Sequence, residues 1–155
     1  MNNLMHDHHL SKTKNNYLNS KLISKKLAFH KAKILLIDDC LIIQTFLTNQ
    51  LRELGYEVEV ANNGIEALDK LNAHYDAIIT DIEMPKMDGL TLIKNIRNSR
   101  KFNKNIPILV LSTLSNEKKV ECIMSGADEV SSKPITSDKL AWLIKKLLKA
   151  NHNPS

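Results

Sequence analysis

The sequence has few of the features found in secreted or membrane proteins. Only two cysteines, Cys40 and Cys122, occur among 155 residues, too few for a disulfide framework. No apolar run approaches the ~18 residues of a membrane span; runs such as Ile34–Ile37 are strand-sized. The N-terminus has no apolar signal core. We therefore predict a cytoplasmic chain without a membrane span, in which both cysteines are buried or half-buried.

Acidic residues are nearly missing from the first part of the chain. Residues 1–33 hold seven lysines and one acid, Asp7, so this stretch carries +6. The whole chain has a net charge of +5, which leaves about −1 for the other 122 residues. The basic character belongs to the N-terminal part, and the remainder shows no electrostatic footprint for nucleic acid.

The basic leader, residues 1–32, allows two interpretations. Its Asn and Lys content is typical of a flexible, solvated tail, which is the simpler hypothesis. Four apolar residues with lysines between them would instead form a short basic amphipathic helix for a partner or a membrane surface; they are Leu18, Leu22, Ile23 and Leu27. Residues 33–150 are predicted to form one domain, followed by a tail at 151–155.

From residue 33 onward, short apolar runs alternate with longer amphipathic stretches. Strands are predicted over 33–38, 57–61, 76–81, 108–112 and 128–131. Helices are predicted over 41–54, 65–72, 90–98 and 115–125, with a last helix marked by an apolar stripe from Leu140 to Leu148. Five βα repeats with continuous apolar strands predict an α/β fold built on a doubly wound parallel sheet.

Polar residues follow four of the predicted strands. Asp38 and Asp39 end the first, Asp81 the third, Ser112 the fourth, and Lys133 comes after the fifth. Any one of them alone is explained by a helix cap or a solvated loop. In doubly wound sheets, however, the reactive site lies beyond the carboxyl ends of the strands. All five are therefore expected around one crevice.

This combination of residues indicates phosphoryl chemistry. Two carboxylates ~4 Å apart repel by about 4 kcal/mol at an effective dielectric near 20, and a hard cation with oxygen ligands, such as Mg²⁺, removes that cost. Asp81 is then a candidate nucleophile that forms an acyl phosphate. Lys133 would pair with the phosphoryl oxygens, and Ser112 would hydrogen-bond to another of them.

These motifs resemble the response-regulator receiver family of two-component signalling. The resemblance runs from about Lys33 to Leu148 and rests on Ile37-Asp38-Asp39, the stretch Asp81 to Gly89, Ser112, Gly126-Ala127-Asp128 and Lys133-Pro134. It implies a flavodoxin-like fold with five strands in the order 2-1-3-4-5 and five helices. It makes Asp81 the phosphoacceptor, with Asp38, Asp39 and the Glu83 backbone carbonyl as Mg²⁺ ligands. Ser112 matches the switch hydroxyl, and Lys133 the phosphate-binding lysine.

Finer similarities point to receivers of hybrid sensor histidine kinases and to stand-alone chemotaxis-type receivers. They imply a single-domain response regulator in a phosphorelay, with a histidine kinase or histidine phosphotransfer protein as donor. The output expected is phosphorylation-dependent docking of a protein, through the face formed by helix four, strand five and helix five. No nucleic-acid contact is expected, and no catalysis beyond assistance to its own phosphorylation and dephosphorylation.

Two residues depart from the family pattern. Thr113 follows the switch hydroxyl, where a small residue is usual, and Val130 stands three residues before the lysine, where an aromatic is common. Pro134 is expected to fix a turn. One alternative is therefore a phosphorylation-independent pseudo-receiver that only binds proteins. Another is a haloacid-dehalogenase-like phosphatase, which would need an Asp where Glu83 stands.

Overall fold

The computed structural model describes residues 14–23 and 30–150. The chain divides into two units, Met1–Lys31 and Ala32–Ser155. The predicted tail at 151–155 lies outside the described residues.

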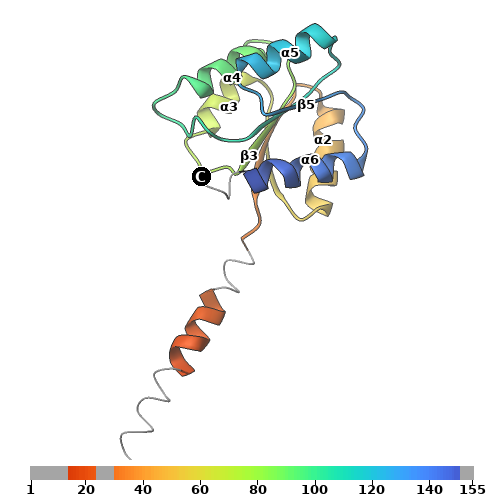
Figure 1. Cartoon of the computed structure of the whole chain (residues 1–155). Coiled ribbons are helices and arrows are strands. Elements are labelled where there is room, and N and C mark those ends of the chain that lie inside the picture. The colour runs from red at the N-terminus through yellow and green to blue at the C-terminus, as the bar shows by residue number, and fades with distance from the viewer. Residues whose placement is uncertain (1–13, 24–29, 151–155) are drawn as a thin grey trace, which may run out of the picture. The chain divides into compact units, whose positions relative to one another are not determined.

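The second unit is a parallel sheet with helices on both faces (Figure 1). Its elements are β1 (Lys33–Ile37), α2 (Leu41–Glu53), β2 (Glu57–Ala61), α3 (Gly64–Lys70), β3 (Ala77–Thr80), α4 (Gly89–Arg97), β4 (Ile108–Leu111), α5 (Asn116–Ser125), β5 (Glu129–Ser131) and α6 (Ser137–Ala150). The strand order is β2-β1-β3-β4-β5. The predicted doubly wound, flavodoxin-like sheet with five helices is confirmed.

Alternating strand residues divide the core into two layers. In β1, Leu35 and Ile37 pack on one side with apolar residues of α3, α4 and α5. Ile34 and Leu36 pack on the other side with apolar residues of α2 and α6. Successive strand residues point to opposite faces, so the continuous apolar run in β1 fills both layers and places this strand inside the sheet.

Side-chain caps define where three helices begin, next to the carboxyl ends of the strands. Asn63 accepts a hydrogen bond from the Glu66 backbone N–H at 3.0 Å, so α3 begins one residue before its predicted start. Asp88 caps α4 through the Thr91 N–H, and Ser115 caps α5 through the Lys118 N–H. Each cap satisfies a backbone donor that the helix leaves free. The loops that enter these helices are therefore tied to the helices they precede.

A charged cluster lies on the outer strand β2. Glu59 accepts a hydrogen bond from the Tyr75 hydroxyl at 2.8 Å and pairs with Lys33 at 3.0 Å and Lys70 at 3.1 Å. The Tyr75 hydrogen bond and then the two lysines lower the pKa of Glu59 to about 2. Lys33 thus belongs to the folded unit. Residues 1–31 hold six lysines and one acid, a net +5, and the other 124 residues sum to zero.

This cluster predicts a specific dependence of stability on pH. Because the pKa of Glu59 is lowered in the folded state, its contribution to the free energy of unfolding is fully present above pH 4.5 and is lost as pH falls toward 2. Glu59→Gln should therefore lower the free energy of unfolding at pH 7, by less than about 1 kcal/mol because the pairs are partly exposed. The difference from wild type should shrink toward pH 2.5. Urea unfolding across this range tests it.

Glu57→Gln removes an exposed carboxylate from the same strand and controls for the loss of one charge. A wild-type-to-variant difference that stays constant from pH 7 to pH 2.5 in Glu59→Gln would contradict the assigned role of the cluster.

The first unit contains a helix at residues 14–23, which we call the leader helix. Its apolar side chains Tyr17, Leu18, Leu22 and Ile23 are each more than half exposed. A helix here agrees with the amphipathic interpretation of the leader, although Leu27 lies outside the described residues. Among the helices that the structure describes, none is long and apolar enough to cross a membrane.

Candidate functional site

The polar residues predicted to form one crevice lie at the carboxyl ends of adjacent strands. Asp38 directly follows β1 and Asp81 directly follows β3, two strands that pair with each other. Ser112 directly follows β4, and Lys133 lies two residues beyond β5. Since β1, β3, β4 and β5 are consecutive in the sheet, the topology brings these four positions to one edge.

Three carboxylates meet at this edge. One oxygen each from Asp38, Asp39 and Asp81 lie within 4.8 Å of one another. Asp38 is buried, with 2% of its surface exposed, while Asp81 is half-buried and Asp39 exposed. Like charges at this separation repel, and burial strengthens the repulsion. The arrangement therefore requires positive charge nearby.

Lys133 supplies part of that charge. Its Nζ lies 2.5 Å from Asp38 Oδ2 and 3.2 Å from Asp81 Oδ2. Burial acts to lower the pKa of Lys133, but the hydrogen bond to Asp38 and the charge of Asp81 outweigh burial, so the pKa is raised. The ammonium remains charged at neutral pH. The Lys133–Pro134 peptide bond that follows is cis.

The Asp81 carboxylate is held from two further directions. Its Oδ1 accepts hydrogen bonds from the Ser112 hydroxyl at 2.6 Å and from the Ile82 backbone N–H at 2.7 Å. Its Oδ2 faces Lys133. Ser112 and Lys133 are thus in direct contact with Asp81, and these contacts hold its carboxylate in one orientation.

The residues present fit a divalent cation. Three carboxylates carry −3 and Lys133 carries +1, which leaves −2 at the cluster. Oxygen ligands around a residual double negative charge suit a hard cation that keeps several waters, as Mg²⁺ does. Asp38, Asp39 and Asp81 are the side chains that would hold it.

Supporting polar contacts that sequence reasoning missed surround Asp38. The Gln44 side chain is buried and donates to the Asp38 backbone carbonyl at 2.5 Å and to Asn62 Oδ1 at 2.8 Å. The Cys40 backbone N–H donates to Asp38 Oδ1 at 2.9 Å. The available signal was Gln44 itself, a polar residue at helical spacing with the core-facing Leu47 and Leu51.

The two cysteines differ in their surroundings. Cys122 is buried, as predicted, but Cys40 is exposed. The expectation for Cys40 was wrong because this residue stands at the N-cap of α2, where its side chain faces away from both core layers.

A glycine holds the loop after β3 against the site. A Cβ on Gly89 would lie 2.2 Å from the Asp81 carbonyl oxygen and 2.9 Å from Ile82 Cα. The Gly89 N–H donates to the Ile82 carbonyl at 2.9 Å, and Lys86 in the same loop has a positive φ of 66°. The loop therefore folds back onto the segment that carries Asp81, at a distance that excludes any side chain at residue 89.

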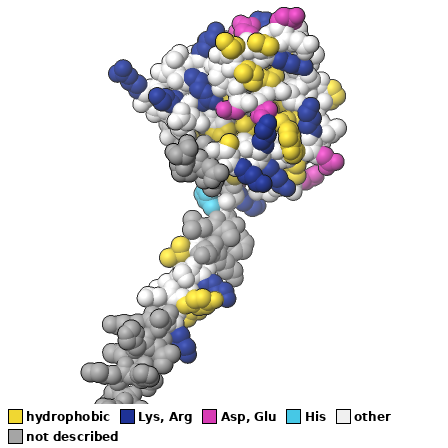
Figure 2. Space-filling view, viewed as in Figure 1, with side chains coloured by type: hydrophobic (Ala, Val, Ile, Leu, Met, Phe, Trp, Pro, Cys, Tyr) yellow, Lys and Arg dark blue, Asp and Glu magenta, His cyan; other side chains and the backbone are white. Residues whose placement is uncertain are grey.

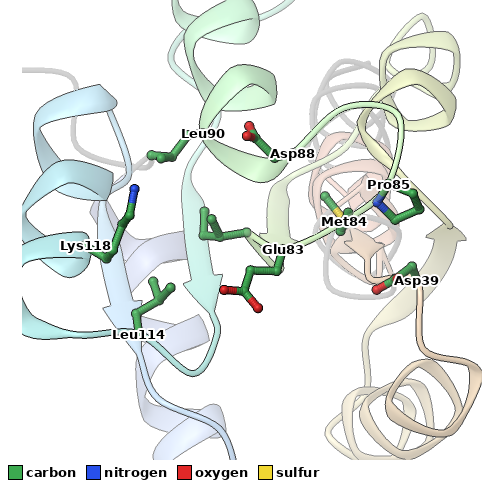
Figure 3. Close-up of a pocket in the computed structure, with 9 residues that line it drawn as sticks. Asp39, Glu83, Met84, Pro85, Asp88, Leu90, Leu114 and Lys118 are labelled. Atoms are coloured by element: carbon green, nitrogen blue, oxygen red, sulfur yellow. The ribbon is translucent and has the colours of Figure 1, made fainter.

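A pocket of about 390 Å³ borders the carboxylates through Asp39. The loop after β3 lines it together with residues that follow β1 and β4 and residues of α4 and α5; the lining residues are Asp39, Ile82, Glu83, Met84, Pro85, Asp88, Leu90, Leu114 and Lys118. Figure 3 shows the Glu83 carboxylate directed toward Leu114 and away from Asp39. Its carboxylate is not among the three that meet at the edge of the sheet, and the role of its backbone carbonyl as a metal ligand stays a prediction.

The two departures from the family pattern occupy different settings. Thr113 is exposed beside Ser112, whereas Val130 is half-buried, pairs with Val110 across β4 and β5, and packs on the core layer of α3, α4 and α5. Val130 is therefore already part of the packed sheet.

Large exposed apolar side chains occur on several helices of the folded unit. Val120, Ile123 and Met124 on α5 and Trp142 on α6 are 47–83% exposed, and the Lys146 ammonium lies 5.2 Å from the Trp142 ring centre. Leu41, Ile42 and Phe46 on α2 are 52–78% exposed. Contiguous exposed apolar groups are typical of protein-binding surfaces.

Comparisons with known proteins agree on one family. Residues 34–145 match the model of the response regulator receiver domain. The chain is 36% identical over 123 residues to the chemotaxis protein CheY1 of Helicobacter pylori, covering 77% of this chain and 98% of that protein. It is 35% identical over 125 residues to a transcriptional regulatory protein CpxR homolog of Haemophilus influenzae, covering 80% of this chain but only 53% of that protein.

A solved receiver domain has a similar fold. The receiver domain of the sensor histidine kinase PA1611 from Pseudomonas aeruginosa, solved with a magnesium ion in its active-site cleft, superposes with a TM-score of 0.71 at 28% identity. The match covers 77% of this chain and 98% of that domain.

Proposed function

Because this chain belongs to the response regulator receiver family, we propose that it accepts a phosphoryl group on Asp81 from a phosphohistidine donor. The donor is a histidine kinase or a histidine phosphotransfer protein, and the reaction requires Mg²⁺. The observation that carries this proposal is the cluster of Asp38, Asp39 and Asp81 with Lys133 and Ser112 in contact with Asp81.

The residues of the cluster divide the work between nucleophile, metal ligand and partner of the phosphoryl oxygens, and Asp81 has the first two roles. A carboxylate oxygen of Asp81 attacks phosphorus; an O–P bond forms as the P–N bond to the donor imidazole breaks. Asp38, Asp39, Asp81 and the Glu83 backbone carbonyl would hold Mg²⁺, and the bound ion would supply positive charge for the phosphoryl oxygens. Lys133 moves from carboxylate to phosphoryl oxygen, and the Ser112 hydroxyl donates to a second one.

Phosphorylation with a small-molecule donor tests this proposal. Acetyl phosphate and Mg²⁺ should add one acid-stable, base-labile phosphoryl group, seen by intact-mass spectrometry, and EDTA should prevent it. An unchanged mass in every condition would favour the pseudo-receiver alternative. The phosphatase alternative has less support, since Glu83 stands where its general acid would be needed and its carboxylate is directed away from Asp39 (Figure 3).

Exposed apolar side chains support two kinds of protein contact. Leu41 and Ile42 at the start of α2 are separated from the acidic pair only by Cys40 and are 73% and 78% exposed, so they suit contact with the donor. The surface of α5, β5 and α6, with Met124 and Trp142, suits a downstream protein target. The chain then acts in the cytoplasm as one step of a phosphorelay.

We expect Lys133→Ala to reduce the rate of phosphorylation at least ten-fold while sparing Mg²⁺ binding. Lys133 contacts Asp38 and Asp81 as a counter-charge, so its removal leaves every carboxylate in place and takes away only the partner of the phosphoryl oxygens. Calorimetric Mg²⁺ titration and acetyl phosphate labelling measure the two effects. Lys145→Ala, an exposed position on α6, is the control. A large loss of Mg²⁺ affinity in Lys133→Ala would contradict the role.

We expect a long-lived acyl phosphate with a muted response around Val130. A branched, half-buried valine has few rotamers and cannot move a ring into the space that Ser112 leaves. Thr113 adds bulk where hydrolytic water approaches. Amide chemical shifts with and without beryllofluoride and Mg²⁺ should change most between Leu114 and Lys118. Equal changes at Val130, or a phosphoryl half-life of seconds, would refute this expectation.

A further inference from the structure

The leader helix sorts its side chains into two distinct faces. At 100° per residue, three of the four apolar residues and both lysines fall on one half of the helix. That half, which we call the basic–apolar face, consists of Lys14, Tyr17, Leu18, Lys21 and Leu22. The opposite half carries uncharged polar residues and Ile23; its polar members are Asn15, Asn16, Asn19 and Ser20. Figure 2 shows apolar and lysine side chains next to one another on this helix.

The basic–apolar face is exposed and contains no acid. Tyr17, Leu18 and Leu22 are 67%, 55% and 61% exposed, and the Lys21 ammonium lies 5.9 Å from the centre of the Tyr17 ring. From His8 to Ile37 the sequence has no acidic residue. A face of this kind attracts negative charge and at the same time offers apolar groups for burial.

From this arrangement we propose that the leader helix binds the surface of a membrane rich in anionic lipids. This inference goes beyond the phosphoryl acceptor function and does not depend on it. The helix would lie in the plane of the interface, with Tyr17, Leu18 and Leu22 entering the headgroup region and the lysines engaging lipid phosphates.

The distribution of charge favours binding of the leader helix to an anionic lipid surface over binding to the folded unit of the same chain. Residues 1–31 carry +5, whereas residues 32–155 carry no net charge. The folded unit therefore offers no overall electrostatic attraction to the leader. An anionic lipid surface does, and each lysine near such a surface strengthens partitioning by about five-fold.

The chemistry of the basic residues favours lipid over a protein groove. All six basic residues of the leader are lysine, and the three arginines lie at residues 52, 97 and 100. Lysine acts as a flexible point charge, whereas arginine provides the bidentate geometry that suits fixed carboxylates at protein interfaces. Lys14 and Lys21 also lie between Tyr17 and Leu18 around the helix, so a protein groove would have to bury both ammonium groups. At a lipid surface their stems lie along the apolar groups while the ammoniums reach the phosphates.

Vesicle flotation of the full chain tests the proposal. The protein should float with vesicles containing one-third phosphatidylglycerol and remain behind with pure phosphatidylcholine vesicles. Lys14→Gln with Lys21→Gln should weaken binding at least ten-fold, and added salt should weaken the wild type. Leu18→Ala with Leu22→Ala, which keeps helix propensity while removing apolar surface, should weaken binding to a similar extent.

Matched control variants distinguish lipid binding by the leader helix from a general effect of positive charge and from a loss of folding. Lys139→Gln with Lys149→Gln removes the same charge from exposed positions of α6 and should leave binding unchanged, as should Asn15→Ala with Asn19→Ala on the opposite face. Acetyl phosphate labelling should be normal in all four variants. A loss of vesicle binding can therefore be told apart from a loss of phosphorylation at Asp81.

Three results would overturn the proposal. The first is equal flotation with neutral and anionic vesicles. The second is binding that the α6 lysine variant weakens as much as the leader variants do. The third is no flotation with anionic vesicles; a lower melting temperature of Leu18→Ala/Leu22→Ala would then show that the leader helix packs against protein.

Discussion

Asp81→Asn is expected to abolish phosphorylation by acetyl phosphate while leaving the protein folded. The amide is nearly the same size as the carboxylate, and its oxygen can still accept the hydrogen bonds from Ser112 and the Ile82 N–H. It has no anionic oxygen to attack phosphorus. Intact-mass spectrometry should show one phosphoryl group on wild type and none on the variant.

The same substitution should change stability in a characteristic way. Removal of one charge from three crowded carboxylates relieves repulsion, so the melting temperature without Mg²⁺ should stay the same or rise. The stabilisation produced by added Mg²⁺ should shrink, because the loss of one ligand weakens Mg²⁺ binding to the native state, and stabilisation by a ligand falls as its Kd rises. Asp69→Asn, at an exposed position of α3, should leave both properties unchanged. Phosphorylation retained in Asp81→Asn, or mapped to Ser112, would contradict the acceptor assignment.

Gly89→Ala is expected to lower the free energy of unfolding by about 2–4 kcal/mol and to slow phosphorylation at least ten-fold. The added Cβ would meet the Asp81 carbonyl oxygen at 2.2 Å and Ile82 Cα at 2.9 Å. Both are backbone atoms next to the acceptor carboxylate and cannot turn aside as a side chain can. The loop, or Asp81 itself, must move. Urea unfolding and acetyl phosphate labelling measure the two effects.

Gly64→Ala provides a matched comparison. Gly64 is likewise the first residue of a helix after a side-chain cap, but its added Cβ would meet the Met87 side chain, at 2.7 Å from Cγ. Methionine is flexible and can adapt, so the stability loss should be clearly smaller and phosphorylation nearly normal. Equal effects in the two variants would show that the close approach of residue 89 to Asp81 is unimportant.

The proposed functions of the two units are independent but compatible. A leader helix on a lipid surface would raise the local concentration of the receiver near any donor on the same membrane. Phosphorylation would still be decided by Asp81 and its neighbours.

Much of this molecule follows from its sequence alone. Continuous apolar runs such as Ile34–Ile37, alternating with amphipathic stretches, are typical of parallel strands covered on both faces, which predicts the doubly wound sheet. Asp38, Asp81, Ser112 and Lys133 stand at strand ends, and parallel strands bring their carboxyl ends to one edge. Their convergence is therefore a consequence of local pattern and general topology.

Other features were decided only by the tertiary structure, because they depend on contacts between segments distant in sequence. In the sequence, Gln44 is one polar residue on a predicted helix. Only the folded structure shows that its side chain donates to the Asp38 carbonyl and to Asn62. In the sequence, Lys33 belongs to the basic N-terminal stretch. In the structure it lies in β1 and pairs with Glu59. The requirement for glycine at residue 89 arises from a loop that folds back onto Asp81. Residue type and spacing determined which side chains form the candidate site. The packing of loops against strands decided which neighbouring residues hold these side chains in place.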